Sequence, residues 1–107
     1  MAKEELSEIL DRLRNGLSEI LGDQLAAIYL YGSQARGDAR NDSDIDVLIL
    51  LQEDFDYGDM LERTIDLVAE LSLEYDVVIS RTFILEERFE HEMSPFLMNV
   101  RREAVPA

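Results

Sequence analysis

Apolar residues recur along this chain at two kinds of spacing, and the first is helical. Between Lys3 and Leu21 they fall three or four positions apart, at Leu6, Ile9, Leu10, Leu13, Leu17, Ile20 and Leu21. This spacing predicts a helix with one apolar face, and Gly22 follows as its expected C-cap. The same spacing predicts a second long helix over 60–73, after an acidic loop at 52–59.

The second kind of spacing is the continuous apolar run, which predicts strands over 25–31 and 45–51. The run at 45–51 is almost wholly apolar, as is typical of a central strand covered on both faces. A third, β-branched strand is expected over 76–80, with Asp76 as its first residue. Residues 82–85 are then expected to form a connection.

The remaining stretches predict shorter elements. We expect a short helix over 33–36 that begins at Gly32-Ser33, a loop over 37–43, and a charged helix over 86–93. Ser94 and Pro95 suit the N-cap and first position of a last helix that runs to Glu103, and 104–107 are expected to be frayed. Strands that alternate with helices predict an α/β (α+β) fold, with a small mixed sheet of three to four strands flanked by helices. The length suits a single domain over 1–107.

Composition limits the chemistry that this domain can perform. The chain has no cysteine and one histidine, so any metal must be held by oxygen atoms. No apolar run approaches the ~20 residues of a membrane span, and the N-terminal residues do not resemble a signal peptide. We therefore expect a soluble, cytoplasmic protein.

The formal net charge is −14. Binding to a nucleic-acid backbone depends on Lys and Arg to displace counterions, so no template strand is expected as a ligand. An acidic surface suits a basic protein partner. It also confers solubility without any partner, and charge alone does not decide between these interpretations.

The residues with the clearest chemistry lie between the first two predicted strands. Asp44 and Asp46 are two apart, so their side chains point to one face of the strand. Asp46 lies within an apolar run, where a carboxylate is costly unless a cation or donors compensate it. Gly32 and Ser33 can form a turn whose N–H groups face an anion. A carboxylate metal site beside a phosphate-binding turn is typical of phosphoryl or nucleotidyl transfer.

An EF-hand calcium loop is a competing interpretation of the same carboxylates. Asp42, Asp44, Asp46 and Glu53 fall at positions 1, 3, 5 and 12 of that pattern. Position 6 requires glycine for the turn but is Val47 here, and the following residues predict a strand. We therefore favour the transfer site.

Gly32-Ser33, then ten residues, then Asp44-x-Asp46 resembles the signature of the DNA polymerase beta-type nucleotidyltransferase superfamily. The fuller runs at 32–37 and 43–46 resemble the small prokaryotic minimal nucleotidyltransferases (MNT), which are partners of HEPN-domain ribonuclease toxins. This resemblance covers about a fifth of the chain and implies the polymerase beta-like nucleotidyltransferase fold.

The resemblance also implies a reaction and the residues that perform it. Two Mg²⁺ ions would be held by Asp44, Asp46 and a third carboxylate, Asp76, which would also act as base. Gly32 and Ser33 would contact the phosphates of the nucleotide, and Arg36 would either bind phosphate or support the loop through a carboxylate. An NMP, AMP if the nucleotide is ATP, would move to a tyrosine hydroxyl of a HEPN toxin, so that this protein acts as an antitoxin.

Two other functions stay open at this point. The domain could silence its partner by occlusion, without catalysis. It could instead be an aminoglycoside-type nucleotidyltransferase for a small molecule, although 107 residues leave little room for an acceptor-binding domain. We therefore expect association, as a hetero-oligomer or a homodimer, to complete the acceptor site.

Overall fold

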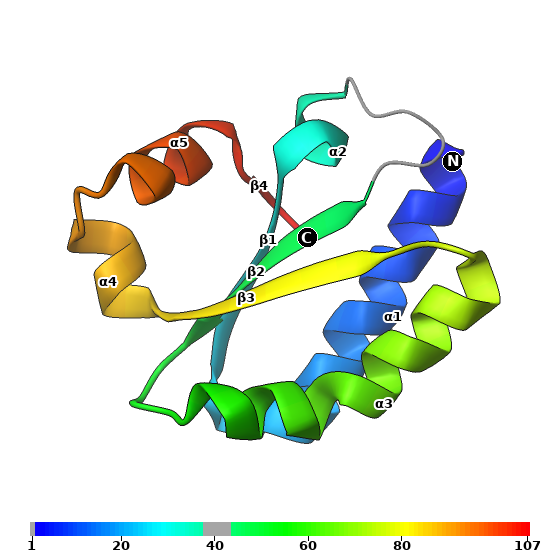
Figure 1. The fold of residues 1–107 in the computed structure, drawn as a ribbon, viewed down its shortest axis with the longest axis horizontal. Coiled ribbons are helices and arrows are strands. Elements are labelled where there is room, and N and C mark those ends of the chain that lie inside the picture. Colours follow the sequence, from blue (N-terminus) through cyan, green and yellow to red (C-terminus); the bar gives the residue numbers. More distant parts are fainter. Residues whose placement is uncertain (1, 38–43) are drawn as a thin grey trace.

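The computed structural model describes residues 2–37 and 44–107 (Figure 1). The expected loop over 37–43 therefore lies, except for Gly37, outside the described residues. The elements are α1 (Lys3–Leu21), the 3₁₀ turn η1 (Gly22–Gln24), β1 (Leu25–Tyr31), α2 (Gly32–Arg36), β2 (Ile45–Leu51), α3 (Tyr57–Tyr75), β3 (Ile79–Leu85), α4 (Glu86–His91), α5 (Pro95–Glu103) and β4 (Val105–Pro106).

The strands form one mixed sheet in the order β3-β2-β1-β4. β1 is antiparallel to both of its neighbours, whereas β2 and β3 are parallel. This arrangement confirms the predicted fold class, including a mixed sheet of up to four strands.

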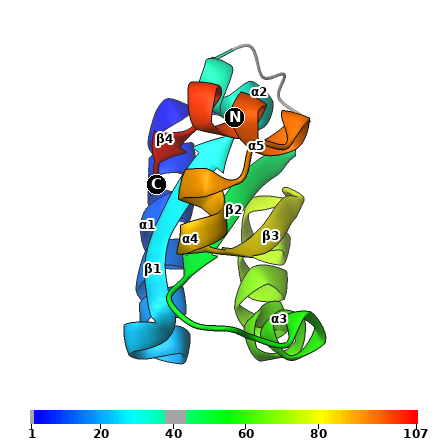
Figure 2. The same ribbon diagram turned by 90° about the vertical axis from the view of Figure 1, so that its left-hand side faces the viewer.

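Helices cover both faces of the sheet (Figure 2). α1 and α3 lie on one face, and α4 and α5 lie on the other. Alternating residues of β2 enter the two apolar layers: Ile45, Val47, Ile49 and Leu51 pack with α1 and α3, while Leu48 and Leu50 pack with α4 and α5. β2 is thus buried on both faces, as its apolar run predicts.

Several predicted boundaries are confirmed. α1, β1 and β2 begin and end at the predicted residues, and Gly22 is the C-cap of α1, with its N–H donating to the Ser18 carbonyl. The Ser94 hydroxyl accepts a hydrogen bond from the Leu97 N–H at 3.3 Å, which caps α5 directly before Pro95. Since 45–51 is a strand, the EF-hand interpretation is wrong.

The prediction for the third strand is wrong. Asp76 does not begin a strand but is the C-cap of α3, in the left-handed region at φ 53° and ψ 52°, with its N–H donating to the Ser72 carbonyl. β3 begins three residues later at Ile79 and includes 82–85, which were expected to be a connection. The β-branched run at 76–80 therefore begins at the C-cap of α3 and ends in the first two residues of β3.

The bounds of two other elements also differ from expectation. α3 begins at Tyr57 rather than Met60, because the Asp56 side chain caps it by accepting from the Asp59 N–H at 2.9 Å. α4 ends at His91, two residues before the predicted end.

The C-terminal residues are paired rather than frayed. β4 extends the sheet beside β1, opposite Tyr29 and Leu30. The Ala107 N–H donates to the Ile28 carbonyl at 3.0 Å. This pairing fixes the direction of the chain after α5.

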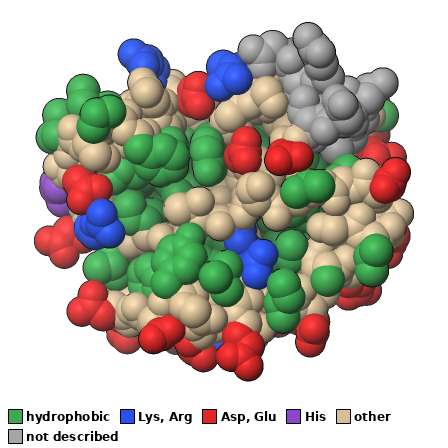
Figure 3. Space-filling model, in the orientation of Figure 1, with side chains coloured by type: hydrophobic (Ala, Val, Ile, Leu, Met, Phe, Trp, Pro, Cys, Tyr) green, Lys and Arg blue, Asp and Glu red, His purple; other side chains and the backbone are tan. Residues whose placement is uncertain are grey.

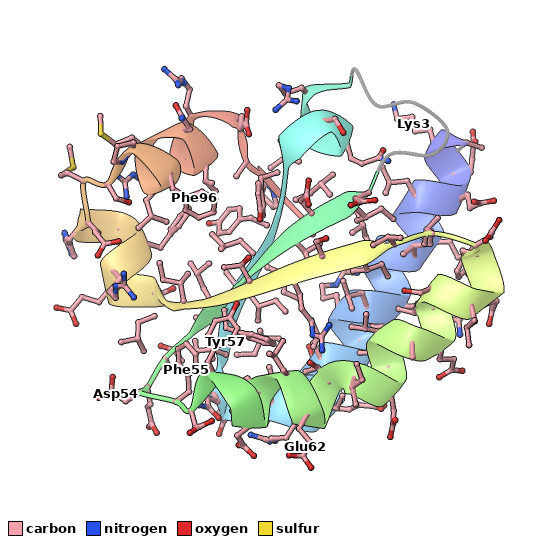
Figure 4. All side chains as sticks on the ribbon, viewed as in Figure 1. Lys3, Asp54, Phe55, Tyr57, Glu62 and Phe96 are labelled. Carbon is pink, nitrogen blue, oxygen red and sulfur yellow. The ribbon has the colours of Figure 1, made fainter. Side chains whose placement is uncertain are left out.

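β3 is an edge strand, and side chains of α3 contact it. The Phe83 N–H donates to the Tyr57 hydroxyl at 3.2 Å, and the two rings meet edge to face with centroids 5.5 Å apart. Phe55 lies beside Tyr57 at the start of α3 (Figure 4). Arg81 reaches from β3 to the Thr64 hydroxyl at 2.9 Å and the Leu61 carbonyl at 3.0 Å.

Within the described residues, no helix is both long enough and apolar enough to cross a membrane.

Two leucines of α3 test the apolar layer that packs against β2. Leu71 is fully buried, whereas Leu73, two residues later, is 84% exposed. Leu71→Ala should lower the free energy of unfolding by about 2–5 kcal/mol through the cavity it leaves. Leu73→Ala should change it by less than about 0.5 kcal/mol. Urea denaturation of the two variants measures both values, and equal losses would contradict this packing.

Candidate functional site

The β1–β2 ladder brings the two halves of the predicted site together. Tyr31, the last residue of β1, lies opposite Asp46, the second residue of β2. Gly32 and Ser33 follow directly and form the first turn of α2, which lies at the end of β1 (Figure 1). Thirteen positions in the sequence separate Ser33 from Asp46, but the antiparallel register brings them to the same end of the sheet.

Gly32 lies against the Asp46 carboxylate. A Cβ on Gly32 would be 2.5 Å from Asp46 Oδ2, closer than nonbonded atoms can approach. Gly32 also has φ +74°, in a region that favours glycine. Glycine therefore suits this position in two ways: its backbone conformation favours glycine, and a side chain here would force the Asp46 carboxylate to move.

The environment of Asp46 opposes its negative charge. Burial raises the pKa of Asp46, the neighbouring Asp44 raises this pKa further, and Arg36 lowers it. Asp44 is exposed directly before β2, and the Ile45 N–H between them is held by the Val78 carbonyl at 2.9 Å. Carboxylates that repel each other at a partly buried position are suited to share a cation.

Asp76 is not gathered with these two carboxylates. It is exposed at the end of α3, and the described residues contain no group of three or more His, Cys, Asp or Glu side chains that could hold a metal ion. The residue of β3 that lies opposite Asp46 is Ser80. The neighbouring strand therefore offers a hydroxyl where the resemblance implies a carboxylate.

Arg36 pairs with Glu103, a residue that was not among the predicted site residues. Arg36 Nη1 donates to Glu103 Oε2 at 3.1 Å, and Glu103 Oε1 accepts from the Gly32 N–H at 3.3 Å. Arg36 was expected either to bind phosphate or to support the loop by pairing with a carboxylate. The contact with Glu103 is a pairing of the second kind. The sequence does hold one sign of this role. An acidic residue in the last turn of a helix is disfavoured by the helix dipole, so Glu103 is expected to serve something other than the stability of α5.

An aromatic pair lies on the α5 side of this turn. Phe96 extends from α5 toward β1 (Figure 4), and its ring meets Tyr31 edge to face at 6.0 Å between centroids. Phe96 is 49% exposed. An accessible aromatic surface thus lies next to the Gly32-Ser33 turn.

The donor atoms at this site fit Mg²⁺. This ion is commonly bound by one or two carboxylates, with substrate phosphates and water as its other ligands. Asp44 and Asp46 supply two carboxylates, and the repulsion between them is what a cation would relieve.

Comparison with known proteins identifies the family of this chain. The family model described as "Nucleotidyltransferase domain" matches residues 10–104. The chain belongs to the nucleotidyltransferase family. Two proteins of Methanocaldococcus jannaschii, both named "Putative protein adenylyltransferase", are each 40% identical to this nucleotidyltransferase. One alignment covers 76 residues, which is 71% of this chain and 76% of the relative; the other covers 90 residues, 83% and 84%.

Solved structures share the fold of this nucleotidyltransferase. A structure named as that of a "putative minimal nucleotidyltransferase" is 27% identical, with a TM-score of 0.57 and 95% of each chain covered. A toxin–antitoxin crystal structure with AMP-PNP has a TM-score of 0.63 at 21% identity and covers 90% of this chain and 69% of that one. A tri-AMPylated HEPN toxin of Shewanella oneidensis in complex with its MNT antitoxin gives 0.56 at 20% identity, covering 99% and 71%. The resemblance to minimal nucleotidyltransferases is confirmed, and the chain is an enzyme that transfers nucleotidyl groups.

Replacing either of two glycines by alanine tests the contact between Gly32 and Asp46. Gly37→Ala should lower the free energy of unfolding by roughly 1 kcal/mol, because Gly37 has φ +79° but no atom within 4 Å of the position that a Cβ would occupy. Gly32→Ala should cost about 2–4 kcal/mol, since overpacking is added to the backbone penalty. Chemical denaturation measures both, and adding Asp46→Ala should relieve part of the cost at Gly32 only.

The raised pKa of Asp46 gives a pH-dependent prediction. Above this pKa the ionised side chain destabilises the fold, and protonation removes that penalty as the pH falls. Asp46→Asn should therefore raise the Tm at neutral pH without metal, and the gain should shrink as the pH is lowered through the pKa of Asp46. Thermal denaturation in EDTA from pH 4 to 8 measures it; a gain independent of pH would contradict the burial of this charge.

Proposed function

We propose that this protein is a Mg²⁺-dependent adenylyltransferase that moves AMP from ATP to a tyrosine hydroxyl of a HEPN toxin, and so acts as an antitoxin. The observation that supports this most directly is the contact of the Gly32 backbone with the Asp46 carboxylate. The proposed phosphate-binding turn thus lies beside the proposed metal-binding carboxylate, and nucleotidyl transfer requires both at one phosphate chain.

In this proposal Gly32 and Ser33 face the phosphates of the nucleotide. Gly32 has no side chain, so the phosphates can approach the backbone of the turn. Ser33, in the first turn of α2, contributes its N–H and hydroxyl groups. Arg36, one helical turn later, places positive charge close enough to lower the pKa of Asp46.

Asp44 and Asp46 would hold Mg²⁺, with two ions expected from the resemblance. When bound, Mg²⁺ would neutralise charge on the phosphate oxygens and on the attacking and leaving oxygens. Asp44 and Asp46 are the carboxylates that would hold it. They must be ionised to do so, and the raised pKa of Asp46 makes this binding weaken as the pH falls.

The reaction forms one bond and breaks another. The oxygen of the acceptor hydroxyl bonds to the α-phosphorus of ATP, and the bond from that phosphorus to the bridging oxygen of pyrophosphate breaks. The hydroxyl proton is released, AMP stays on the acceptor, and pyrophosphate leaves. The half-exposed Phe96, beside Tyr31, provides a surface on which the adenine ring can stack.

The acceptor is proposed to belong to a partner protein. The relatives from M. jannaschii are named for protein adenylylation, and toxin–antitoxin complexes share the fold. The net charge of −14 and the acidic side chains, which lie mostly around the rim of the face in Figure 3, suit a partner with a basic surface. Binding to it would complete the acceptor site of this small domain.

Incubation with the protein encoded by the neighbouring gene, labelled ATP and Mg²⁺ tests the proposal. Intact mass should show a partner heavier by one or more AMP units and an unchanged nucleotidyltransferase. Asp44→Ala and Asp46→Ala should each lower the rate by more than about a hundredfold, because the metal loses a ligand. EDTA should have the same effect.

Asp76→Asn tests the third carboxylate that the resemblance implies, because asparagine tolerates the left-handed conformation of this cap. A rate within about threefold of the wild type would match a residue that only caps α3. A loss as large as that of Asp44→Ala would instead support the third-carboxylate role that the resemblance implies. A tight complex of the two chains with no mass change would favour occlusion over catalysis.

A further inference from the structure

The carboxylate of Glu103 bridges two residues of the proposed phosphate-binding segment. One oxygen accepts from the Gly32 N–H at 3.3 Å, and the other accepts from Arg36 Nη1 at 3.1 Å. Gly32 begins α2 and Arg36 ends it. A single side chain therefore connects both ends of this short helix to the end of α5.

Glu103 is itself held in place from two directions. Leu97 and Val100 bury α5 against the sheet with 1% and 2% exposure, and the Ala104 N–H continues the helix ladder to the Val100 carbonyl at 2.7 Å. The next two residues form β4 and pair with β1. The carboxylate is thus presented to α2 by a fixed backbone.

Folding alone does not account for this contact. The side chains of Arg36 and Glu103 are 47% and 27% exposed, and ion pairs in contact with water contribute little to stability. Glu103 also stands at the negative end of the α5 dipole, which disfavours an acidic residue. Asp46 is a further negative charge on the other side of Gly32.

We propose that Glu103 is a positioning residue for nucleotide binding. Its carboxylate holds the Gly32 backbone and the Arg36 guanidinium in the arrangement that meets the phosphates. Because Glu103 accepts from the Gly32 N–H, this N–H is not offered to the phosphates, and Ser33 supplies the next N–H of the turn together with its hydroxyl. The inference rests on the proposed function, and it makes the position of α5 a determinant of ATP affinity.

Nucleotide affinity and steady-state kinetics of two variants test this role. Glu103→Ala should weaken binding of a fluorescent ATP analogue with Mg²⁺, and raise the KM for ATP in AMP transfer, by about tenfold, because a charge-assisted contact to the turn is lost. The value of kcat should change far less, and the Tm should stay near that of the wild type. Glu103→Gln should lie between, since its amide oxygen still accepts from Gly32 but no longer balances the charge of Arg36.

Glu92→Ala is the matched control. It removes an ion pair of similar exposure, Arg88 Nη2 to Glu92 Oε1 at 2.8 Å, at the C-terminal end of α4 and away from the turn. Its KM and affinity should equal those of the wild type. Arg36→Ala combined with Glu103→Ala should cost less than the sum of the two single losses, because both variants remove the contact between Arg36 and Glu103.

Three results would overturn the inference, and they can be told apart. If Glu103→Ala keeps the wild-type KM and affinity, Glu103 does not position the turn, while the proposed function stands. If Glu103→Ala lowers Tm and the active fraction but not the affinity, its role is structural. If the wild type binds no nucleotide and Asp46→Ala changes nothing, the proposed function fails and this inference fails with it.

Discussion

The contact between the Gly32 backbone and the Asp46 carboxylate is the constraint on which this site depends. It requires a residue without a side chain, a positive φ angle, and a β1–β2 register that sets Tyr31 opposite Asp46. A shift of that register by one residue would turn Asp46 into the layer occupied by α1 and α3. The apolar residues on both faces of β2 prevent such a shift, so the core of the protein also fixes the geometry of its chemistry.

Asp46 illustrates how a stable core and a reactive site are combined in a small domain. Its neighbours in β2 are fully buried, yet it lies at the end of the strand where the helical layers leave the sheet partly open. Burial there is sufficient to oppose ionisation but insufficient to exclude water or a ligand. The fold therefore accepts an unfavourable charge at the position where a cation or a phosphate chain can relieve it.

Local sequence signals predicted most of the fold and indicated the two segments, at Gly32 and at Asp46, that the structure brings together. Helical periodicity and apolar runs defined α1, β1 and β2, and the spacing of Gly32-Ser33 from Asp44-x-Asp46 indicated the family. β3 was misplaced because its polar residues Ser80, Arg81 and Thr82 conceal the strand, while Val77 and Val78 imitate one. The role of Asp76 as a third carboxylate is implied by the resemblance and stays a prediction. β4 has two residues and is stabilised by pairing with β1, so no local pattern indicates it.

Glu103 shows a different limit of sequence analysis. Its partners are 67 and 71 positions away, and only the packing of α5 brings them together. Contacts between residues so far apart in the sequence depend on the topology of the whole fold, and composition and periodicity do not specify that topology. What the sequence did contain was a local inconsistency, an acidic residue at the wrong end of a helix, and such inconsistencies are expected where a residue serves the site rather than the fold.

The hydroxyl of Tyr57 has a consequence for how this protein meets other chains. An edge strand presents a row of free N–H and C=O groups to which a foreign strand can be added, and such edges promote aggregation unless they are protected. On β3, the Phe83 N–H donates a hydrogen bond to the Tyr57 hydroxyl, and the Arg81 side chain donates one to the Thr64 hydroxyl of α3. An incoming strand must displace an aromatic side chain before it can pair here. Tyr57 thus protects one backbone N–H of this seven-residue edge strand against pairing with a foreign strand.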